Sequence, residues 1–198
     1  YVFSECFAAI AMSEYALASG DRTYAEKALD LFKRILRNLA TPGLLEPKYL
    51  PTLQARGHSI TMILIHAASR IRAAISDPIL DTQINESIAA IRRYFMHPEF
   101  KALLEMVGPD GELIDTCNGR VINPGHCIET AWFILEEAKH RHWDKDLVQM
   151  GIRILEWSWE WGWDKEYGGI INFRDCRNFP VQDYSQDMKF WWPQCETI

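Results

Sequence analysis

The chain has 198 residues, of which 48% are hydrophobic and 24% charged, and this composition excludes a disordered or low-complexity protein. Its 21 basic and 27 acidic residues give a formal charge of -6, which argues against a nucleic-acid binder with a broad basic face. No run of about 18 apolar residues occurs, so the sequence predicts no membrane-spanning segment.

The five cysteines are far apart and never form a Cys-x-x-Cys pair, a pattern typical of reduced thiols. We therefore expect a cytoplasmic protein. The closest pair of histidines, His140 and His142, has no third ligand nearby, so we expect no metal site there.

Apolar residues at helical spacing predict a helical hairpin at the start of the chain. Its first helix begins at Phe3 and ends at Ser19-Gly20-Asp21, and its second ends at Thr41-Pro42-Gly43. A second pair covers residues 59–75 and then continues to Phe95, with Asp77 as the N-cap of the return helix.

The stretch from Leu103 to Asn123 changes character and predicts a β-hairpin, or an irregular loop of similar shape, around Gly108-Pro109-Asp110-Gly111. A third helical pair is expected over residues 124–139 and 144–161, followed by a turn into a short strand at 170–173. A seventh helix is expected to begin near Asp187.

Repeated helical pairs with loops between them predict an all-α fold, a toroid of α-hairpins closed into an α/α barrel with a small β-hairpin. Such a barrel has its ligand pocket at one end. The chain lacks an initiator Met and stops without a helix-stop signal. We therefore expect residues 1–198 to be the central part of a single barrel domain whose N- and C-terminal helices are missing.

The segment Asn123-Pro124-Gly125-His126 predicts a helix start at which His126 is the third helical residue. The unpaired N–H groups of the first turn disfavour an imidazolium, so a neutral His126 is a usable base. Glu129 follows on the same face and could orient the ring or bind a hydroxyl. The alternative is that His126 only caps a packed helix.

Two other clusters are candidates for ligand contact. Trp191 and Trp192 cannot both face one core, because neighbours on a helix are about 100° apart, so one of them is expected to present a flat aromatic face to a sugar, with Gln194 and Glu196 as hydrogen-bond partners. The alternative is an aromatic core with a solvated Glu196. Arg56 and His58 precede an apolar helix, where a surface location is the competing interpretation.

The sequence contains no P-loop, Rossmann, α/β-hydrolase or zincin motif. Four stretches together resemble the N-acylglucosamine 2-epimerase family, also known as renin-binding proteins, in order and over essentially the whole chain. They are Phe3-Ser4-Glu5-Cys6-Phe7, Asn123-Pro124-Gly125-His126 with Glu129, Gly162-Trp163-Asp164 with Gly168-Gly169, and Met188-Lys189-Phe190-Trp191-Trp192-Pro193-Gln194 with Glu196.

This resemblance implies an (α/α)6 barrel that interconverts N-acetylglucosamine and N-acetylmannosamine by moving the proton on C2. It also implies a homodimer and ATP as an activator that is not consumed. His126 matches the family's first histidine, whereas the second lies in a His-x-Pro-Arg-like motif that this sequence lacks. We assign His126 and Glu196 to catalysis, and the expected substrate contacts are Glu129, Trp192, Trp191, His58 and Arg56.

Two alternatives stay open at this point. Related enzymes epimerise cellobiose or isomerise mannose on the same barrel, although the Asn-Pro before Gly125-His126 favours the acylglucosamine branch. The other alternative is a renin-binding-type interaction protein without catalysis.

Overall fold

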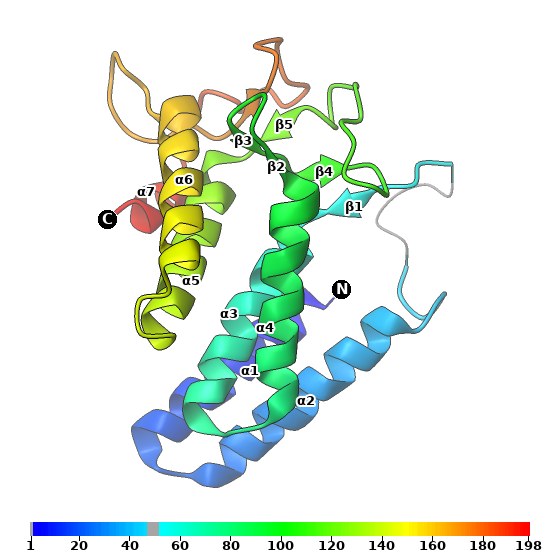
Figure 1. Cartoon of the computed structure of the whole chain (residues 1–198), viewed down its shortest axis with the longest axis vertical. Coiled ribbons are helices and arrows are strands. Elements are labelled where there is room, and N and C mark those ends of the chain that lie inside the picture. The colour runs from blue at the N-terminus through cyan, green and yellow to red at the C-terminus, as the bar shows by residue number, and fades with distance from the viewer. Residues whose placement is uncertain (1, 47–51) are drawn as a thin grey trace. The chain divides into compact units, whose positions relative to one another are not determined.

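The structure is a computed structural model that describes residues 2–46 and 52–198. The chain forms two compact units. Unit 1 contains Tyr1–Gln54 and Ile60–Ala89, and unit 2 contains Ala55–Ser59 and Ala90–Ile198. Figure 1 shows the elements in chain order.

Unit 1 begins with the predicted hairpin, formed by α1 (Phe3–Ser19) and α2 (Arg22–Ala40), which pack against each other. Gly20 ends α1 in the left-handed region, with φ of 76°, and its N–H donates to the carbonyl of Ala16. Asp21 then caps α2, because its Oδ1 accepts from the N–H of Thr23 at 3.0 Å. The Ser-Gly-Asp break in the sequence is therefore a C-cap followed directly by an N-cap.

The second predicted pair consists of α3 (His58–Ala74), which enters unit 1 at Ile60, and α4 (Pro78–Ala90). Asp77 caps α4 as expected, since its Oδ1 accepts from the N–H of Ile79 at 3.0 Å. The core of unit 1 is almost entirely aliphatic, with Phe32 as its largest side chain. It includes Ala25, Ala28, Phe32, Ile35, Ile65, Ala68, Ile71, Leu80 and Ile84.

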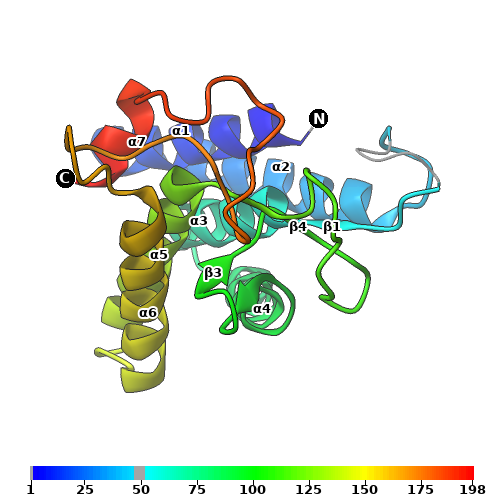
Figure 2. The same ribbon diagram turned by 90° about the horizontal axis from the view of Figure 1, so that it is seen from above.

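Unit 2 is built on α5 (Pro124–His140) and α6 (Lys145–Gly162), which form the third predicted hairpin. A short helix, α7 (Trp191–Glu196), lies against α5 in both Figure 1 and Figure 2. It begins at Trp191 rather than near Asp187, so that prediction of its start is wrong by four residues.

Three pairs of two-residue antiparallel strands complete unit 2. They are β1 (Arg56–Gly57) with β4 (Met106–Val107), β2 (Met96–His97) with β3 (Ala102–Leu103), and β5 (Val121–Ile122) with β6 (Arg174–Asp175). A π-helical turn, η1 (Ile91–Phe95), leads into β2.

The small β-hairpin is therefore present, but it is β2–β3, and the turn at Gly108 to Gly111 does not join two paired strands. The strand before that turn, β4, pairs with β1, which lies about fifty residues earlier in the chain. Residues 170–173 form only a single bridge, between Ile170 and Trp163, and the nearby strand is β6. Local turn signals located the irregular region correctly and could not identify the strand partners.

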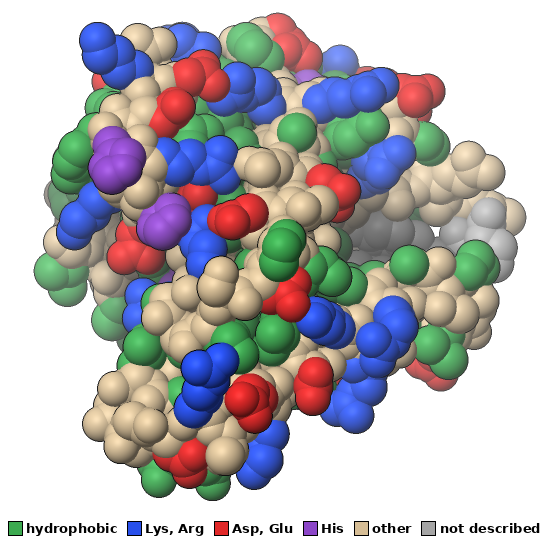
Figure 3. Space-filling view, turned by 60° about the horizontal axis from the view of Figure 1, so that its bottom comes forward, with side chains coloured by type: hydrophobic (Ala, Val, Ile, Leu, Met, Phe, Trp, Pro, Cys, Tyr) green, Lys and Arg blue, Asp and Glu red, His purple; other side chains and the backbone are tan. Residues whose placement is uncertain are grey.

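The surface in Figure 3 shows Lys and Arg side chains interspersed with Asp and Glu. On the face in this view, neither sign of charge forms a continuous patch.

Candidate functional site

The site is built around His126 at the start of α5. Asn123 caps this helix, with its Oδ1 accepting from the N–H of His126 at 3.2 Å, and Pro124 is the first helical residue. The Asn-Pro-Gly-His pattern therefore positions His126 as the sequence predicts. Its side chain is 28% exposed, so the ring is partly buried and still accessible to a ligand.

Glu105 holds the His126 ring, and the sequence did not identify it. Both carboxylate oxygens lie 3.1 Å from Nδ1 of His126. The backbone of Glu105 is held on both sides, because its N–H donates to the carbonyl of Val121 and its carbonyl accepts from the N–H of His58. The signal that could have revealed it is a lone carboxylate in the apolar run 103–107, since a carboxylate buried in such a run requires a partner.

His58 lies on the other side of Glu105. It is fully buried, so the interpretation that places it on the surface is wrong. Its Nδ1 is 3.5 Å from Oε1 of Glu105, and its Nε2 is 3.0 Å from Oγ1 of Thr130 on α5. The structure therefore brings His58 into the same cluster as His126.

Arg56 makes its contacts outside the cluster of His126, Glu105 and His58. It is exposed, its Nε donates to the carbonyl of Pro109 at 2.5 Å, and its guanidinium lies 4.3 Å from the centre of the Tyr94 ring. These contacts tie β1 to the turn after β4 and to η1.

Two histidines outweigh the effect of burial on Glu105. Burial raises the pKa of this carboxyl, but His126, whose Nδ1 is within hydrogen-bond distance, holds its pKa well below the usual range, and His58 adds a smaller effect in the same direction. Glu105 is consequently a carboxylate at neutral pH.

Trp192 on α7 covers His126. The two ring centres are 5.3 Å apart and the ring planes are inclined by 38°. This approach requires glycine at position 125, since a Cβ atom there would lie 2.6 Å from the Trp192 ring. Trp191 is 77% exposed, which confirms that the adjacent tryptophans face different surroundings.

Glu129 and Glu196 supply two further carboxyl groups. Glu196 is half-buried on α7, and its Oε2 accepts from the indole N–H of Trp132 at 2.8 Å. Burial and then the charge of Glu196 raise the pKa of Glu129 to about 7. Near neutral pH, Glu129 can therefore both donate and accept hydrogen bonds.

Gln194 was expected to contact a ligand, but its amide is committed to the backbone. Its Oε1 accepts from the N–H of Ile170 at 2.9 Å, and its Nε2 donates to the carbonyl of the same residue at 2.7 Å. Gln194 therefore fixes the loop after α6 against α7.

Within residues 2–46 and 52–198, no group of three or more His, Cys, Asp or Glu side chains is arranged to hold a metal ion. None of the described helices combines the length and apolar character required to cross a membrane.

The sequence pattern of the N-acylglucosamine 2-epimerase family matches residues 1–198. The N-acylglucosamine 2-epimerases of Homo sapiens and Bos taurus are 30% and 29% identical to this chain over its full length. In each case the match covers 47% of the relative, so the chain spans about half the length of the curated relatives it matches.

Solved structures show the same fold. A sugar epimerase from a ruminal bacterium superposes with a TM-score of 0.76 at 19% identity, over 99% of this chain and 52% of its own. Cellobiose 2-epimerase from Bacillus thermoamylovorans gives 0.76 at 18% identity, over 98% and 52%. A D-mannose isomerase gives 0.72 at 16% identity, over 100% and 53%. The helix-rich fold, of the (α/α)6 barrel class, is thereby confirmed.

Proposed function

This chain belongs to the N-acylglucosamine 2-epimerase family, and from that premise we propose that it is an isomerase that interconverts N-acetylglucosamine and N-acetylmannosamine. The reaction removes the proton on C2 of the ring-opened sugar and returns it to the opposite face. The observation that carries the proposal is a partly exposed histidine, His126, that is held by a carboxylate at one ring nitrogen and covered by an indole.

His126 is the acid/base group on one face of C2. The aldehyde carbonyl of the open-chain sugar makes the C2 proton acidic, and its removal gives an enolate. Imidazole can both accept and give up a proton, so a histidine suits both removal and return of the C2 proton. Inversion requires a second group on the opposite face, which the family resemblance places in a motif that this sequence lacks.

Glu129 and Glu196 support the sugar beside His126. In its protonated form, Glu129 can donate a hydrogen bond to an oxygen on which negative charge develops, and with a pKa of about 7 both forms are present at neutral pH. Glu196 is an acceptor for sugar hydroxyl groups, and the Trp132 indole fixes its orientation.

Trp192 supplies the aromatic surface. An indole ring packs well against the apolar C–H face of a sugar, and here it lies directly against the His126 ring. A sugar that contacts Trp192 is thereby brought next to the proposed base.

We also propose a homodimer, a cytoplasmic location and activation by ATP, and these rest on the family resemblance and on the reduced thiols. A cavity of about 140 Å³ is lined by Arg92, Met96, Asp146, Gln149, Met150 and Arg153. Because it is smaller than the roughly 300–1,000 Å³ typical of small-molecule sites, the nucleotide is not assigned to this cavity. Rates measured with and without ATP would decide the activation.

The substrate is tested with a full-length protein that contains this chain together with the second acid/base group, incubated separately with N-acetylmannosamine, mannose and cellobiose, with the products followed by chromatography. We expect conversion of N-acetylmannosamine to N-acetylglucosamine to be the fastest of the three reactions. Faster turnover of mannose or cellobiose would assign the chain to one of the alternative sugar activities. No turnover of any of the three would overturn the enzymatic proposal and favour an interaction protein.

A further inference from the structure

The carboxylate of Glu105 lies between two histidines. The donors and acceptors around it indicate which histidine donates a hydrogen bond to it. The hydroxyl of Thr130 donates its single proton to the carbonyl of His126 at 2.8 Å. The same oxygen lies 3.0 Å from Nε2 of His58, so it must accept a proton from that nitrogen. A neutral His58 therefore carries its proton on Nε2.

This tautomer leaves a lone pair on Nδ1 of His58, facing Oε1 of Glu105 at 3.5 Å. A lone pair donates nothing to a carboxylate, and the distance is longer than that of a good hydrogen bond. On the other side, Nδ1 of His126 lies 3.1 Å from both oxygens of Glu105. An ionised carboxylate only accepts, so Nδ1 of His126 must be the donor.

We propose that Glu105 is the positioning residue of this site: it fixes His126 in the tautomer with the proton on Nδ1, so that Nε2 is the nitrogen that exchanges a proton with the sugar. His58 and Thr130 complete the arrangement, because the Thr130 hydroxyl directs the His58 proton away from Glu105. This inference rests on the proposed function only where it names the sugar.

The backbone supports this role. Glu105 is held at its N–H by Val121 of β5 and at its carbonyl by the N–H of His58, so its side chain leaves a fixed point beside α5. The other titratable groups around the pair are Cys127 and Glu129 on α5 and Glu196 on α7. Burial raises the pKa of the Cys127 thiol well above its usual value, which leaves Glu105 as the ionised partner of His126.

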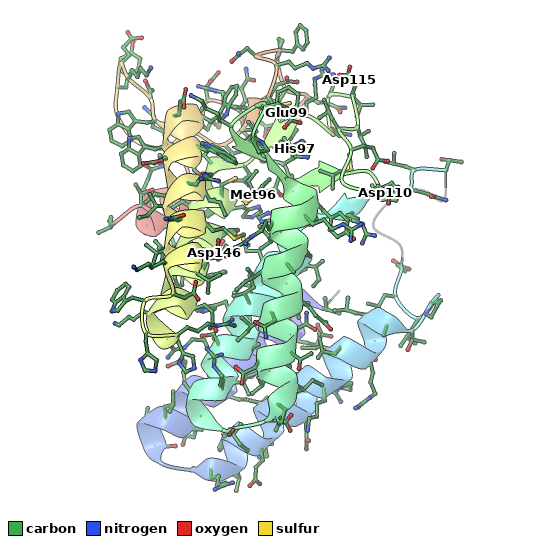
Figure 4. All side chains as sticks on the ribbon, in the orientation of Figure 1. Met96, His97, Glu99, Asp110, Asp115 and Asp146 are labelled. Atoms are coloured by element: carbon green, nitrogen blue, oxygen red, sulfur yellow. The ribbon has the colours of Figure 1, made fainter. Side chains whose placement is uncertain are left out.

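A second histidine and carboxylate pair in unit 2 provides a matched control. Nδ1 of His97 lies 2.9 Å from Oε1 of Glu99, and Figure 4 shows the two side chains close together beside β2. The Glu99 side chain is 58% exposed, compared with 19% for Glu105. Removing Glu99 therefore removes the same kind of contact without touching the His126 site.

The test is the tautomer of His126, read from the ¹⁵N chemical shifts of its ring nitrogens in labelled protein. In the wild type we expect the proton on Nδ1 at neutral pH. In Glu105→Ala we expect it to move to Nε2, with kcat lowered by about 10- to 100-fold and KM changed by less than about threefold, because Glu105 does not touch the sugar. Glu99→Ala should change neither the His126 tautomer nor the rate.

Glu105→Gln keeps the shape of the side chain and serves if the alanine variant does not fold. Its amide oxygen still accepts from Nδ1 but carries no charge, so we expect the acid limb of the pH profile of kcat/KM to move to lower pH. A wild-type His126 protonated on Nε2, a tautomer unchanged in Glu105→Ala, or a pH profile unchanged in Glu105→Gln would overturn the inference. The NMR measurement needs no substrate, so it decides the role of Glu105 even if no sugar is turned over.

Discussion

The two units differ in what they bury. Among the described residues, the buried polar side chains of unit 1 are Ser13 and Ser87, whereas unit 2 buries His58, His97, Asn123, Thr130, Glu137, Ser158, Asn172, Asp175 and Ser185. Ser13 merely returns its hydroxyl to the carbonyl of Ala9 in its own helix. In unit 2 some of the buried groups connect different segments, as His58 does with Thr130 on α5 and Asp175 with Arg120, and this is where His126 is held. We conclude that unit 1 contributes apolar helix packing and unit 2 contributes the chemistry.

The largest expected effect is on the stability of unit 1. Phe32→Ala removes a fully buried aromatic ring from α2 and should lower the free energy of unfolding by about 3–5 kcal/mol, measured by urea denaturation. Phe7→Ala on α1 is the control, because that ring is 59% exposed and its loss should cost less than about 1 kcal/mol. Equal losses in the two variants would contradict the apolar packing assigned to this unit.

Next comes the buried carboxyl of Glu129 in unit 2. Its pKa in the folded protein is about 7 and its ordinary value is 4.5, so between these pH values the folded chain holds a proton that the unfolded chain has released. Stability from this group is therefore lost as the pH rises from 5 to 8. The free energy of unfolding of Glu129→Gln, relative to that of the wild type, should therefore increase by on the order of 2 kcal/mol between pH 5 and pH 8. Unfolding measurements at both pH values check this.

Glu156→Gln is the control for that prediction, since Glu156 is an exposed carboxylate on α6. Its stability difference from the wild type should be the same at both pH values. A Glu129→Gln variant with no such pH dependence would show that Glu129 is ionised in the folded protein at neutral pH.

Trp192→Ala should lower kcat/KM for N-acetylmannosamine roughly tenfold, which corresponds to about 1.4 kcal/mol. The physical reason is the loss of the aromatic surface beside His126. Trp191→Ala removes the neighbouring ring, which is 77% exposed, and should change kcat/KM by less than about twofold. The reverse order of effects would assign the sugar contact to Trp191.

The smallest expected effect comes from the surface charges of unit 1. Arg22 and Glu26 form an ion pair at 3.5 Å with both side chains mostly exposed, so Arg22→Ala should change the free energy of unfolding by less than about 0.5 kcal/mol. In unit 2, Arg141 is paired at 2.6 Å with the fully buried carboxylate of Glu137. Arg141→Ala should therefore cost clearly more than Arg22→Ala in the same urea experiment.

Helix positions could be predicted from the sequence because their signals are local. The Ser19-Gly20-Asp21 break and the caps at Asp77 and Asn123 all lie where the structure has them. The same local signal placed His126 at the third position of α5.

Contacts between distant segments could not be predicted in this way. The strands have only two residues each, and β1 and β6 pair with segments about fifty residues away, so periodicity carries no information on their partners. Glu105 lies beside one of these strands, 21 residues before His126, and it is visible in the sequence only as a charge within an apolar run. His58 was located correctly at a helix start, but its burial depends on the same pairing.

The proposed role of His126 in moving the C2 proton is tested most directly by ¹H NMR of N-acetylmannosamine in D₂O with the full-length protein that contains this chain. The spectra follow the exchange of the C2 proton for solvent deuterium. We predict exchange with the wild type and a rate at least about 100-fold lower with His126→Asn, the size expected for removal of a general acid/base. His140→Asn, at the exposed far end of the same helix, should keep the rate within about twofold of the wild type. A folded His126→Asn variant that exchanges the proton at the wild-type rate would contradict the claim.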